Sequence, residues 1–472
     1  MPFMPFQILG LWFRGLLSVA ILVGGIYLLR RWYDESHVVE VGSGAPAAVE
    51  PGRGDVDRGA DRPAPGADRT AAGARVFRFD PGWNRPTAYL AAALALLSWA
   101  TLGRWIGHGI SMLTLNRGTS PGQGSGSNPG QGSGAGRGKR SGSSRGKRSG
   151  SGQGKGSGGV REREPDEDPR AERTGEVHTI RRPDGSELRV ECYGPADAPP
   201  IVWTHGWGAN STEWFYAKKH LAGRFRLIVW DEPGLGLSKK PDNNDYRLET
   251  FAANLEAVLA FAGGRPAVLV GHSIGGMTVL TFCKVFPEAL GTRVAGLVLV
   301  HTTYTNPVRT TQMAGLYTAL EKPVLIPLMY LTIATWPLMW LMNWMSYFNG
   351  SAHQSTHKTS FAGGETRGQL DFCARYLPEV RPDVLARGML GMIAYDATAT
   401  LSTIPVPTLV VVGDKDTTTL PEAGQFIASS VPNAKLATLS PARHMGLIEH
   451  HGEFDRLVAD FTGSCQRTGI KR

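Results

Sequence analysis

Cysteine is scarce in this chain, which has only 4 among 472 residues. Four scattered cysteines cannot build the disulfide framework of a small secreted domain, so that class of protein is excluded. The sequence also lacks a cluster of His, Cys and Asp with the spacing of a metal site, and we expect neither a metal nor a cofactor. Cys283 and Cys373 are expected to be small buried hydrophobic residues.

Acidic residues are absent from residues 116–160, which carry eight Lys and Arg. The whole chain has a net charge of +9, so nearly all of its excess positive charge lies in this segment. Gly and Ser dominate it, and Arg137-Gly-Lys-Arg-Ser-Gly-Ser recurs at Arg145. With almost no apolar side chains to bury, residues 116–175 are predicted to be a disordered linker. Because no aromatic residue is present to stack on bases, contact with anionic lipid or simple solvation is favoured over nucleic-acid binding.

Charged residues are rare in two long stretches near the N-terminus, Ile8–Leu29 and Thr87–Ile106. Each has about the 20 residues that a helix needs to span a bilayer. Two arginines follow the first stretch where a signal peptide would have small residues, which favours a retained transmembrane helix over a secretory signal. The second stretch is rich in Ala, and a buried amphipathic helix is the alternative. We therefore predict a membrane anchor over residues 1–115, with a solvated loop over residues 34–85.

The sequence gives conflicting signals for the side of the membrane on which the C-terminal part lies. Two spans would place the N-terminus and the C-terminal part on the same side. Arginines at the ends of the two stretches favour a cytoplasmic position for the loop between them. The basic linker favours a cytoplasmic position for the linker. Both cannot hold, because the second span would separate the loop from the linker. Because nothing in the sequence requires disulfides, a cytoplasmic C-terminal domain is the prediction.

From residue 176 onward, short β-rich runs alternate with helical patterns. We expect an antiparallel strand pair first, followed by alternating strands and helices. The strands are expected at 177–181, 188–193, 200–204, 225–230, 267–270, 294–300, 408–412 and 434–439. The helices are expected at 212–221, 248–259, 274–286, 422–430 and 449–461. This alternation predicts an α/β domain over residues 176–472, with a mostly parallel sheet covered by helices on both faces.

A G-x-S-x-G motif occurs at Gly271-His272-Ser273-Ile274-Gly275. The motif alone is weak, because Gly142-Ser143-Ser144-Arg145-Gly146 in the linker fits it equally well. Only the first match follows an apolar strand and opens a helix, which is the setting of a nucleophile elbow. The alternative is a glycine-rich turn without chemistry. The context makes Ser273 the candidate nucleophile.

A nucleophilic serine needs a base, and the base needs a carboxylate that orients it. Gly413-Asp414-Lys415-Asp416 follows one late strand, and His444 follows the next. Both loops lie at the carboxyl ends of strands, where open parallel sheets form their sites. The sequence therefore predicts a catalytic serine, aspartate and histidine at one edge of the sheet.

With these motifs, residues 176–464 resemble the α/β-hydrolase superfamily, in its lipase, esterase and epoxide-hydrolase-like branch. The resemblance is carried by His205-Gly206-Trp207-Gly208, Asp231–Ser238, the Ser273 elbow, Gly413–Asp416, and His444 followed by Glu449. It implies the α/β-hydrolase fold and Asp416 as the residue that orients His444. Asp414 is then a structural turn residue. The resemblance also implies an oxyanion hole made by the backbone N–H groups of Trp207 and Ile274.

Ser273 stands where epoxide hydrolases and haloalkane dehalogenases have an aspartate, which favours acyl chemistry over alkyl-enzyme chemistry. Structural roles are expected for three neighbours of the site. His205 is expected to stabilise its turn, and His272 to pack or form local hydrogen bonds. Asp231 is expected to accept hydrogen bonds from neighbouring backbone and so hold the adjacent loops. His450 and His451 are expected on the surface of the final helix.

Charged residues are absent again from Pro323 to Ser351, within a segment of residues 302–403 that is expected to form a cap. The run is long enough to span a bilayer. Spanning would separate the two halves of one sheet across a membrane, and Pro327 and Pro337 break the run into short helices. Two interpretations are left: a buried pair of cap helices, or a lid that faces lipid or a lipophilic substrate.

The sequence as a whole predicts a membrane-tethered serine hydrolase that cleaves a carboxylic ester of a hydrophobic or lipid-like substrate through an acyl-enzyme. The expected partners are the membrane and a small-molecule or lipid substrate. Alternatives with the same triad are C–C bond hydrolysis, cofactor-free perhydrolysis and acyl transfer. A non-catalytic hydrolase-like scaffold at the membrane is a further alternative. Neither the exact substrate nor the oligomeric state is predicted.

Overall fold

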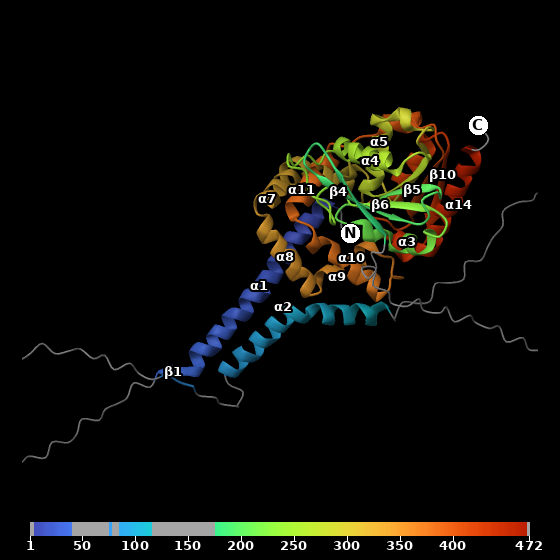
Figure 1. The fold of residues 1–472 in the computed structure, drawn as a ribbon. Coiled ribbons are helices and arrows are strands. Elements are labelled where there is room, and N and C mark those ends of the chain that lie inside the picture. The colour runs from blue at the N-terminus through green and yellow to red at the C-terminus, as the bar shows by residue number, and fades with distance from the viewer. Residues whose placement is uncertain (1–3, 40–74, 78–84, 116–174, 470–472) are drawn as a thin grey trace, which may run out of the picture.

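The computed structural model describes residues 4–39, 75–77, 85–115 and 175–469. A pair of long N-terminal helices extends from a globular part that begins at strand β3 (Figure 1). The predicted linker lies outside the described residues, except for Gly175.

The two N-terminal apolar stretches form helices α1 (Met4–Ser36) and α2 (Arg85–Leu115), which pack against each other. Within them, Gly15–Ser36 and Arg85–Gly103 are long and apolar enough to cross a membrane, judged by length and composition. Most large apolar side chains described on α1 point away from the rest of the chain. The most exposed are Phe13, Leu16, Leu17, Val23, Ile26 and Tyr27.

Short strands β1 (His37–Val39) and β2 (Arg75–Phe77) pair antiparallel between the two helices. Val and Phe fit a pleated strand, which accounts for the local structure. The prediction of a loop over residues 34–85 is therefore wrong at its two ends, where this ladder forms and where α1 continues to Ser36. The middle of that loop lies outside the described residues.

An eight-stranded sheet forms the centre of the globular part, in the order β10-β9-β8-β7-β5-β6-β4-β3. Its strands are β3 (Glu176–Arg181), β4 (Glu187–Tyr193), β5 (Pro200–Thr204), β6 (Arg226–Trp230), β7 (Ala267–His272), β8 (Val294–Val300), β9 (Thr408–Gly413) and β10 (Ala434–Leu439). The pairs β3–β4 and β4–β6 are antiparallel, and all other neighbours are parallel. The predicted α/β class with a mostly parallel sheet is confirmed.

Side chains of the central strands alternate between two hydrophobic cores, because successive residues of a strand point to opposite faces. On β5, Ile201 and Trp203 lie in one core and Val202 in the other. The first core is covered by α3 (Phe215–Leu221), the short α13 (Gly446–Glu449) and α14 (His451–Gly469). The second is covered by α4 (Leu248–Ala262), α5 (Ile274–Val285) and α12 (Pro421–Ser430). The sheet is thus buried on both faces, as its nearly continuous apolar strands require.

A helical cap connects β8 to β9. Its helices are α6 (Ala314–Leu320), α7 (Ile326–Ala334), α8 (Trp336–Phe348), α9 (Ser351–Ser360), α10 (Arg367–Glu379) and α11 (Pro382–Ile393). Pro337 lies in the first turn of α8, where a missing N–H costs no intrahelical hydrogen bond. Pro327 lies where α7 continues the π-helical turn Glu321–Leu325. The chain bends by 96° between Ala314–Ala334 and Trp336–Phe348, so the predicted break at Pro337 is confirmed. The predicted break at Pro327 is wrong, because this proline lies within the continuous helical stretch Ala314–Ala334. The pair would count as a further membrane span only if the bent helices were taken together.

The apolar cap run is partly buried and partly exposed. Met339 and Met342 of α8 are buried, whereas Leu338 and Leu341 on the same helix are 47% and 51% exposed. Tyr330 on α7 is 60% exposed. Helix α8 therefore has one side packed against its neighbours, α1 among them, and an apolar side that is exposed.

Helix α1 lies along α8 of the cap, and α2 contacts α8 and α9. Gly15 of α1 lies against Met342, at a distance where a Cβ would overlap the methionine side chain. Close by, Asn349 Nδ2 donates a hydrogen bond to Ser18 Oγ of α1. Gly103 of α2 lies against the backbone of the same asparagine. Small residues thus let the N-terminal helices approach the cap closely, as they do at helix interfaces in membranes.

Candidate active site

Ser273 lies on a tight turn between β7 and α5. Its φ of 53° and ψ of −117° are unusual for a residue with a side chain, and such strain is typical of functional sites. The glycines of the motif permit the turn. A Cβ at Gly271 would overlap the carbonyl of Gly275, and a Cβ at Gly275 would overlap the carbonyl of Thr204. The G-x-S-x-G sequence therefore folds as the expected elbow.

The backbone fixes Ser273 at the head of α5. Its N–H donates to Val300 O at 2.9 Å, and its carbonyl accepts from Thr302 Oγ1 at 2.6 Å. Ile274 is the first residue of the helix, so its N–H is among those that a helix leaves without an intrahelical acceptor. The positive end of the helix dipole also lies here, which favours negative charge beside Ser273.

His444 and Asp416 form a buried hydrogen-bonded pair at the carboxyl ends of β10 and β9. His444 Nδ1 lies 2.9 Å from Asp416 Oδ2. A carboxylate accepts only, so Nδ1 carries the proton and Nε2 is left as an acceptor. The N–H groups of Thr418 and Thr419 donate to Asp416 Oδ1 at 2.8 and 3.2 Å. Thr419 Oγ1 donates to Asp416 Oδ2 at 2.9 Å.

Asp414 has a different environment. Its carboxylate accepts from the N–H of Ala442 at 2.9 Å and from Ser440 Oγ at 2.8 Å. It thereby holds the loop that leads to His444, without contacting the imidazole. This matches the structural turn role expected for Asp414.

The electrostatics of the pair suit a general base. Burial lowers the pKa of His444 to about 4, although Asp416 acts in the opposite direction. Burial alone would raise the pKa of Asp416, but the imidazoles of His444 and His301 hold that pKa well below its usual value. At neutral pH the pair is therefore an ionised carboxylate beside a neutral imidazole, the form that can accept a proton.

His272 connects the serine turn to the histidine loop. Its Nε2 lies 3.2 Å from the carbonyl oxygen of His444, and its Nδ1 lies 2.9 Å from Glu213 Oε1. Glu213 Oε2 in turn accepts from the N–H of Gly206 at 2.9 Å, beside Trp207. The local hydrogen bonds expected for His272 are present. They link the elbow, the Trp207 turn and the His444 loop into one buried network.

His205 and Asp231 have the structural contacts that the sequence suggested. His205 Nδ1 donates to Gly206 O at 2.9 Å, and its Nε2 accepts from the N–H of Glu232 at 2.9 Å. Asp231 accepts from the N–H groups of Ser211 and Leu237 at 2.6 and 2.8 Å. Both side chains hold the loops that surround the elbow.

The sequence prediction missed His301 and Glu213. His301 follows β8 directly, and its buried Nδ1 lies 3.3 Å from Asp416 Oδ2. Its φ of 44° marks a second strained residue at this edge of the sheet. Its position at the carboxyl end of a parallel strand was a usable signal. Glu213 has no comparable position in a sequence motif, because only the tertiary fold brings it next to His272.

The prediction of a surface position is wrong for His451. Its side chain is buried and stacks on Tyr216, with ring centroids 3.7 Å apart. His451 begins α14, whose inner side packs against α3. The neighbouring His450 is partly exposed and contacts Pro441 O at 2.7 Å.

Comparison with known proteins identifies the family. A family model described as the alpha/beta hydrolase fold matches residues 199–451, and the chain belongs to this family. The putative carbamate hydrolase RutD of Stutzerimonas stutzeri is 23% identical over 277 residues, which are 58% of this chain and 96% of that protein. The bifunctional esterase/perhydrolase DCH of Acinetobacter calcoaceticus is 34% identical over 111 residues, 22% of this chain and 38% of that protein.

Among solved structures, the esterase EaEST of Exiguobacterium antarcticum is similar with a TM-score of 0.51 and 20% identity. The similarity covers 61% of this chain and 100% of the esterase. At this identity the likeness shows the fold alone. The α/β-hydrolase fold, which the sequence motifs suggested, is therefore confirmed.

Proposed function

We propose that this protein is a serine hydrolase that cleaves carboxylic esters through an acyl-enzyme. Ser273 is the proposed nucleophile, His444 the base and Asp416 the carboxylate that orients the base. The observation that carries the proposal is the strained Ser273 turn, which His272 connects to the buried His444–Asp416 pair. The esterase and hydrolase relatives support the same class of reaction.

In the proposed reaction, Ser273 Oγ attacks the ester carbonyl while His444 Nε2 accepts the hydroxyl proton. The N–H groups of Trp207 and Ile274 would stabilise the negative charge that forms on the carbonyl oxygen, a contribution of about 3–4 kcal/mol in comparable sites. His444 then gives the proton to the departing alkoxide. Water attacks the acyl group on Ser273, with His444 again as base, and the products are an alcohol and a carboxylic acid.

The proposed substrate is an ester of a hydrophobic acyl group or alcohol. The support comes from the cap, whose α7 and α8 expose large apolar side chains beside buried methionines. Exposed apolar side chains gathered on two neighbouring helices are typical of a site for lipid or an apolar ligand. The sequence left a buried cap pair and a lipid-facing lid as alternatives, and the exposed side of α8 favours the lid.

We further propose that α1 and α2 anchor the protein in a membrane. Both contain a stretch of spanning length, and α1 exposes many of its large apolar residues. An exposed apolar helix is unfavourable in water and favourable in a bilayer. Because α1 packs along α8, the anchor would hold the cap at the membrane surface.

The test is hydrolysis of p-nitrophenyl esters of graded acyl chain length by the full chain in detergent micelles. We expect turnover that increases from short to medium and long chains, and a loss of about 10⁴-fold or more in Ser273→Ala. The variant is a matched control, because it removes one hydroxyl and leaves the fold and the cap unchanged. Equal turnover by both proteins, or none by the folded wild type with any ester, would overturn the proposed function.

A further inference from the structure

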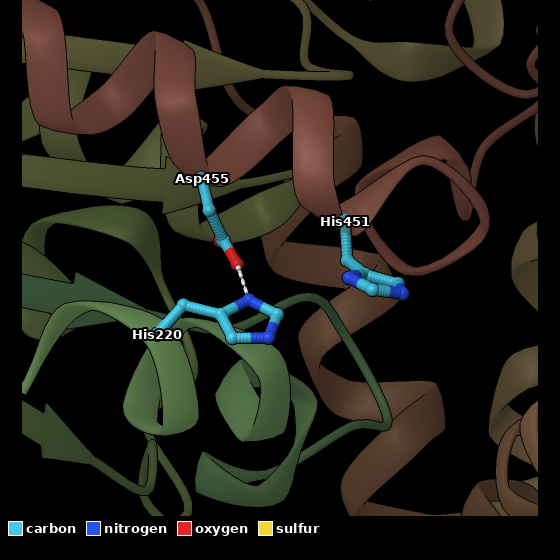
Figure 2. A group of neighbouring side chains, drawn as sticks. All are labelled: His220, His451 and Asp455. Atoms are coloured by element: carbon cyan, nitrogen blue, oxygen red, sulfur yellow. Dashed lines mark hydrogen bonds and ion pairs between the residues drawn. The ribbon is translucent and has the colours of Figure 1, made fainter. Parts of the chain in front are cut away.

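Three side chains able to bind a metal meet on the α3–α14 face of the sheet, apart from the proposed catalytic residues (Figure 2). His220 is in the last turn of α3, and His451 and Asp455 are in the first turns of α14. His220 Nδ1 lies 2.7 Å from Asp455 Oδ2. Each side chain offers one ligand atom, and the three atoms lie within 4.8 Å of one another.

The fold assembles this cluster from distant parts of the chain. His451 and Asp455 are four residues apart on one helix, a spacing that places both side chains on the same face. His220 comes 235 residues before Asp455 and reaches the cluster because α3 packs against α14. The sequence predicted no metal site because its spacing does not reveal this third member.

The surroundings orient the cluster. The His451 ring lies parallel to that of Tyr216, at an interplanar angle of 5°. Tyr216 OH accepts a hydrogen bond from Gln369 Nε2 at 3.0 Å, and Gln369 also donates to Ile448 O at 3.0 Å. These contacts fix the plane of the His451 imidazole, as supporting residues do around metal-binding histidines.

The carboxylate of Asp455 supplies an independent observation that points to a bound cation. Its side chain is 95% buried, and its Oδ1 has no hydrogen-bond partner among the described residues. A buried carboxylate oxygen without a partner is costly, and a bound cation would remove that cost. The side chain of His220 is 37% exposed, which leaves a route from solvent to the cluster.

We propose that His220, His451 and Asp455 bind a zinc ion that joins α3 to α14, with water as the fourth ligand. Two imidazoles and a carboxylate form a donor set that zinc accepts, whereas Ca²⁺ and Mg²⁺ prefer oxygen ligands. In a tetrahedral site with bonds of about 2 Å, the donors lie ~3.3 Å apart, so small side-chain rotations bring the three atoms into place. The ion stabilises the packing of the two helices and takes no part in the chemistry at Ser273.

The experiment measures Zn²⁺ binding to the full chain in detergent, purified without a polyhistidine tag. The protein is first treated with a chelator, then titrated with Zn²⁺ against a chromophoric competitor, and in parallel with Co²⁺, whose visible spectrum reports tetrahedral coordination. The variants are His220→Gln, His451→Gln and Asp455→Asn. The matched control is His450→Gln, which removes an imidazole next to the cluster but outside it.

We expect one tightly bound Zn²⁺ per chain, a tetrahedral Co²⁺ spectrum, and a higher thermal unfolding midpoint with zinc than without it. Each cluster variant should lose at least tenfold in affinity together with the zinc-dependent rise in the midpoint, and His450→Gln should behave like the wild type. His220→Gln decides the matter if the buried variants fail to fold, because His220 is the most exposed of the three. Equal affinity of His220→Gln and the wild type, or no zinc bound to the folded wild type, would overturn the proposal.

Discussion

At the scale of residues, Asp416 is the group on which the proposed site depends. It accepts hydrogen bonds from His444 and from two threonines, and His301 lies 3.3 Å away. These donors keep the carboxylate ionised in a buried place, where an ion without partners would be unstable. The ionised carboxylate in turn keeps the proton of His444 on Nδ1 and leaves Nε2 to act as base.

Replacement of Asp416 by Asn should therefore reduce kcat by about 10⁴-fold, because an amide can hold the wrong tautomer of His444. Asp414→Asn is the matched control: it lies two residues away, holds the His444 loop, and should lower kcat by less than tenfold. The measurement is ester hydrolysis at saturating substrate, with circular dichroism as a check of the fold. If the two variants lose equal activity, Asp416 has no special role in orienting the base.

The pH dependence follows from the protonation of His444. Only the neutral imidazole accepts the serine proton, so kcat/KM should fall as the pH decreases through the pKa of this residue. Burial lowers that pKa to about 4, so the acid limb should lie well below 6.5. A pH profile of kcat/KM tests this, with each sample re-assayed at neutral pH to exclude unfolding. An acid limb at or above 6.5 would contradict the assigned environment of His444.

At the scale of elements, the sequence predicted each strand of the parallel block to within about two residues, because buried apolar runs and their turns are local signals. It also predicted the elbow, since a strand, two glycines and a helix are contiguous in the chain. The contacts of His301, Glu213 and His220 were not predictable in this way. They depend on which strands and helices become neighbours in the fold, and these neighbours cannot be predicted from local patterns in a single sequence.

The contact of α1 with the cap is another pairing that the sequence did not reveal. Gly15 lies against Met342, so Gly15→Ala should force α8 to shift, an overpacking cost of about 1–3 kcal/mol. Gly24→Ala is the matched control on the same helix, because its nearest neighbour is Leu96 Cδ1 at an ordinary 3.5 Å. Both changes favour the helix equally by propensity. In thermal unfolding in detergent, Gly15→Ala should have the lower midpoint, and equal midpoints would mean that α1 does not pack on the cap.

At the scale of the whole molecule, the net positive charge, the proposed anchor and the hydrolase fold belong to different segments. Nearly all of the net positive charge lies in residues 116–160, the candidate spans lie before that segment, and the hydrolase fold follows it. Although the N-terminal helices are far from the cap in sequence, α1 and α2 both contact α8 of the cap. If α1 and α2 anchor the chain as proposed, the hydrolase takes its substrate at the membrane surface.

If α1 and α2 both span the membrane as proposed, the N-terminus and the hydrolase fold lie on one side of it. Tags at the two ends of the chain should therefore be cleaved together or protected together when intact cells are treated with protease. A cytoplasmic enzyme, as the sequence predicts, protects both tags until the membrane is permeabilised. Cleavage of one tag alone would show that the chain crosses the membrane an odd number of times.

The most direct test of the proposed chemistry is covalent labelling of the folded full chain with a fluorophosphonate, followed by mapping of the modified residue by mass spectrometry. The account predicts one label per chain on Ser273, and none on Ser144, whose surrounding sequence has the same G-x-S-x-G pattern. Ser273→Ala should remain unlabelled. No labelling of the folded wild type, or equal labelling of Ser273→Ala, would contradict the assignment of this protein as a serine hydrolase.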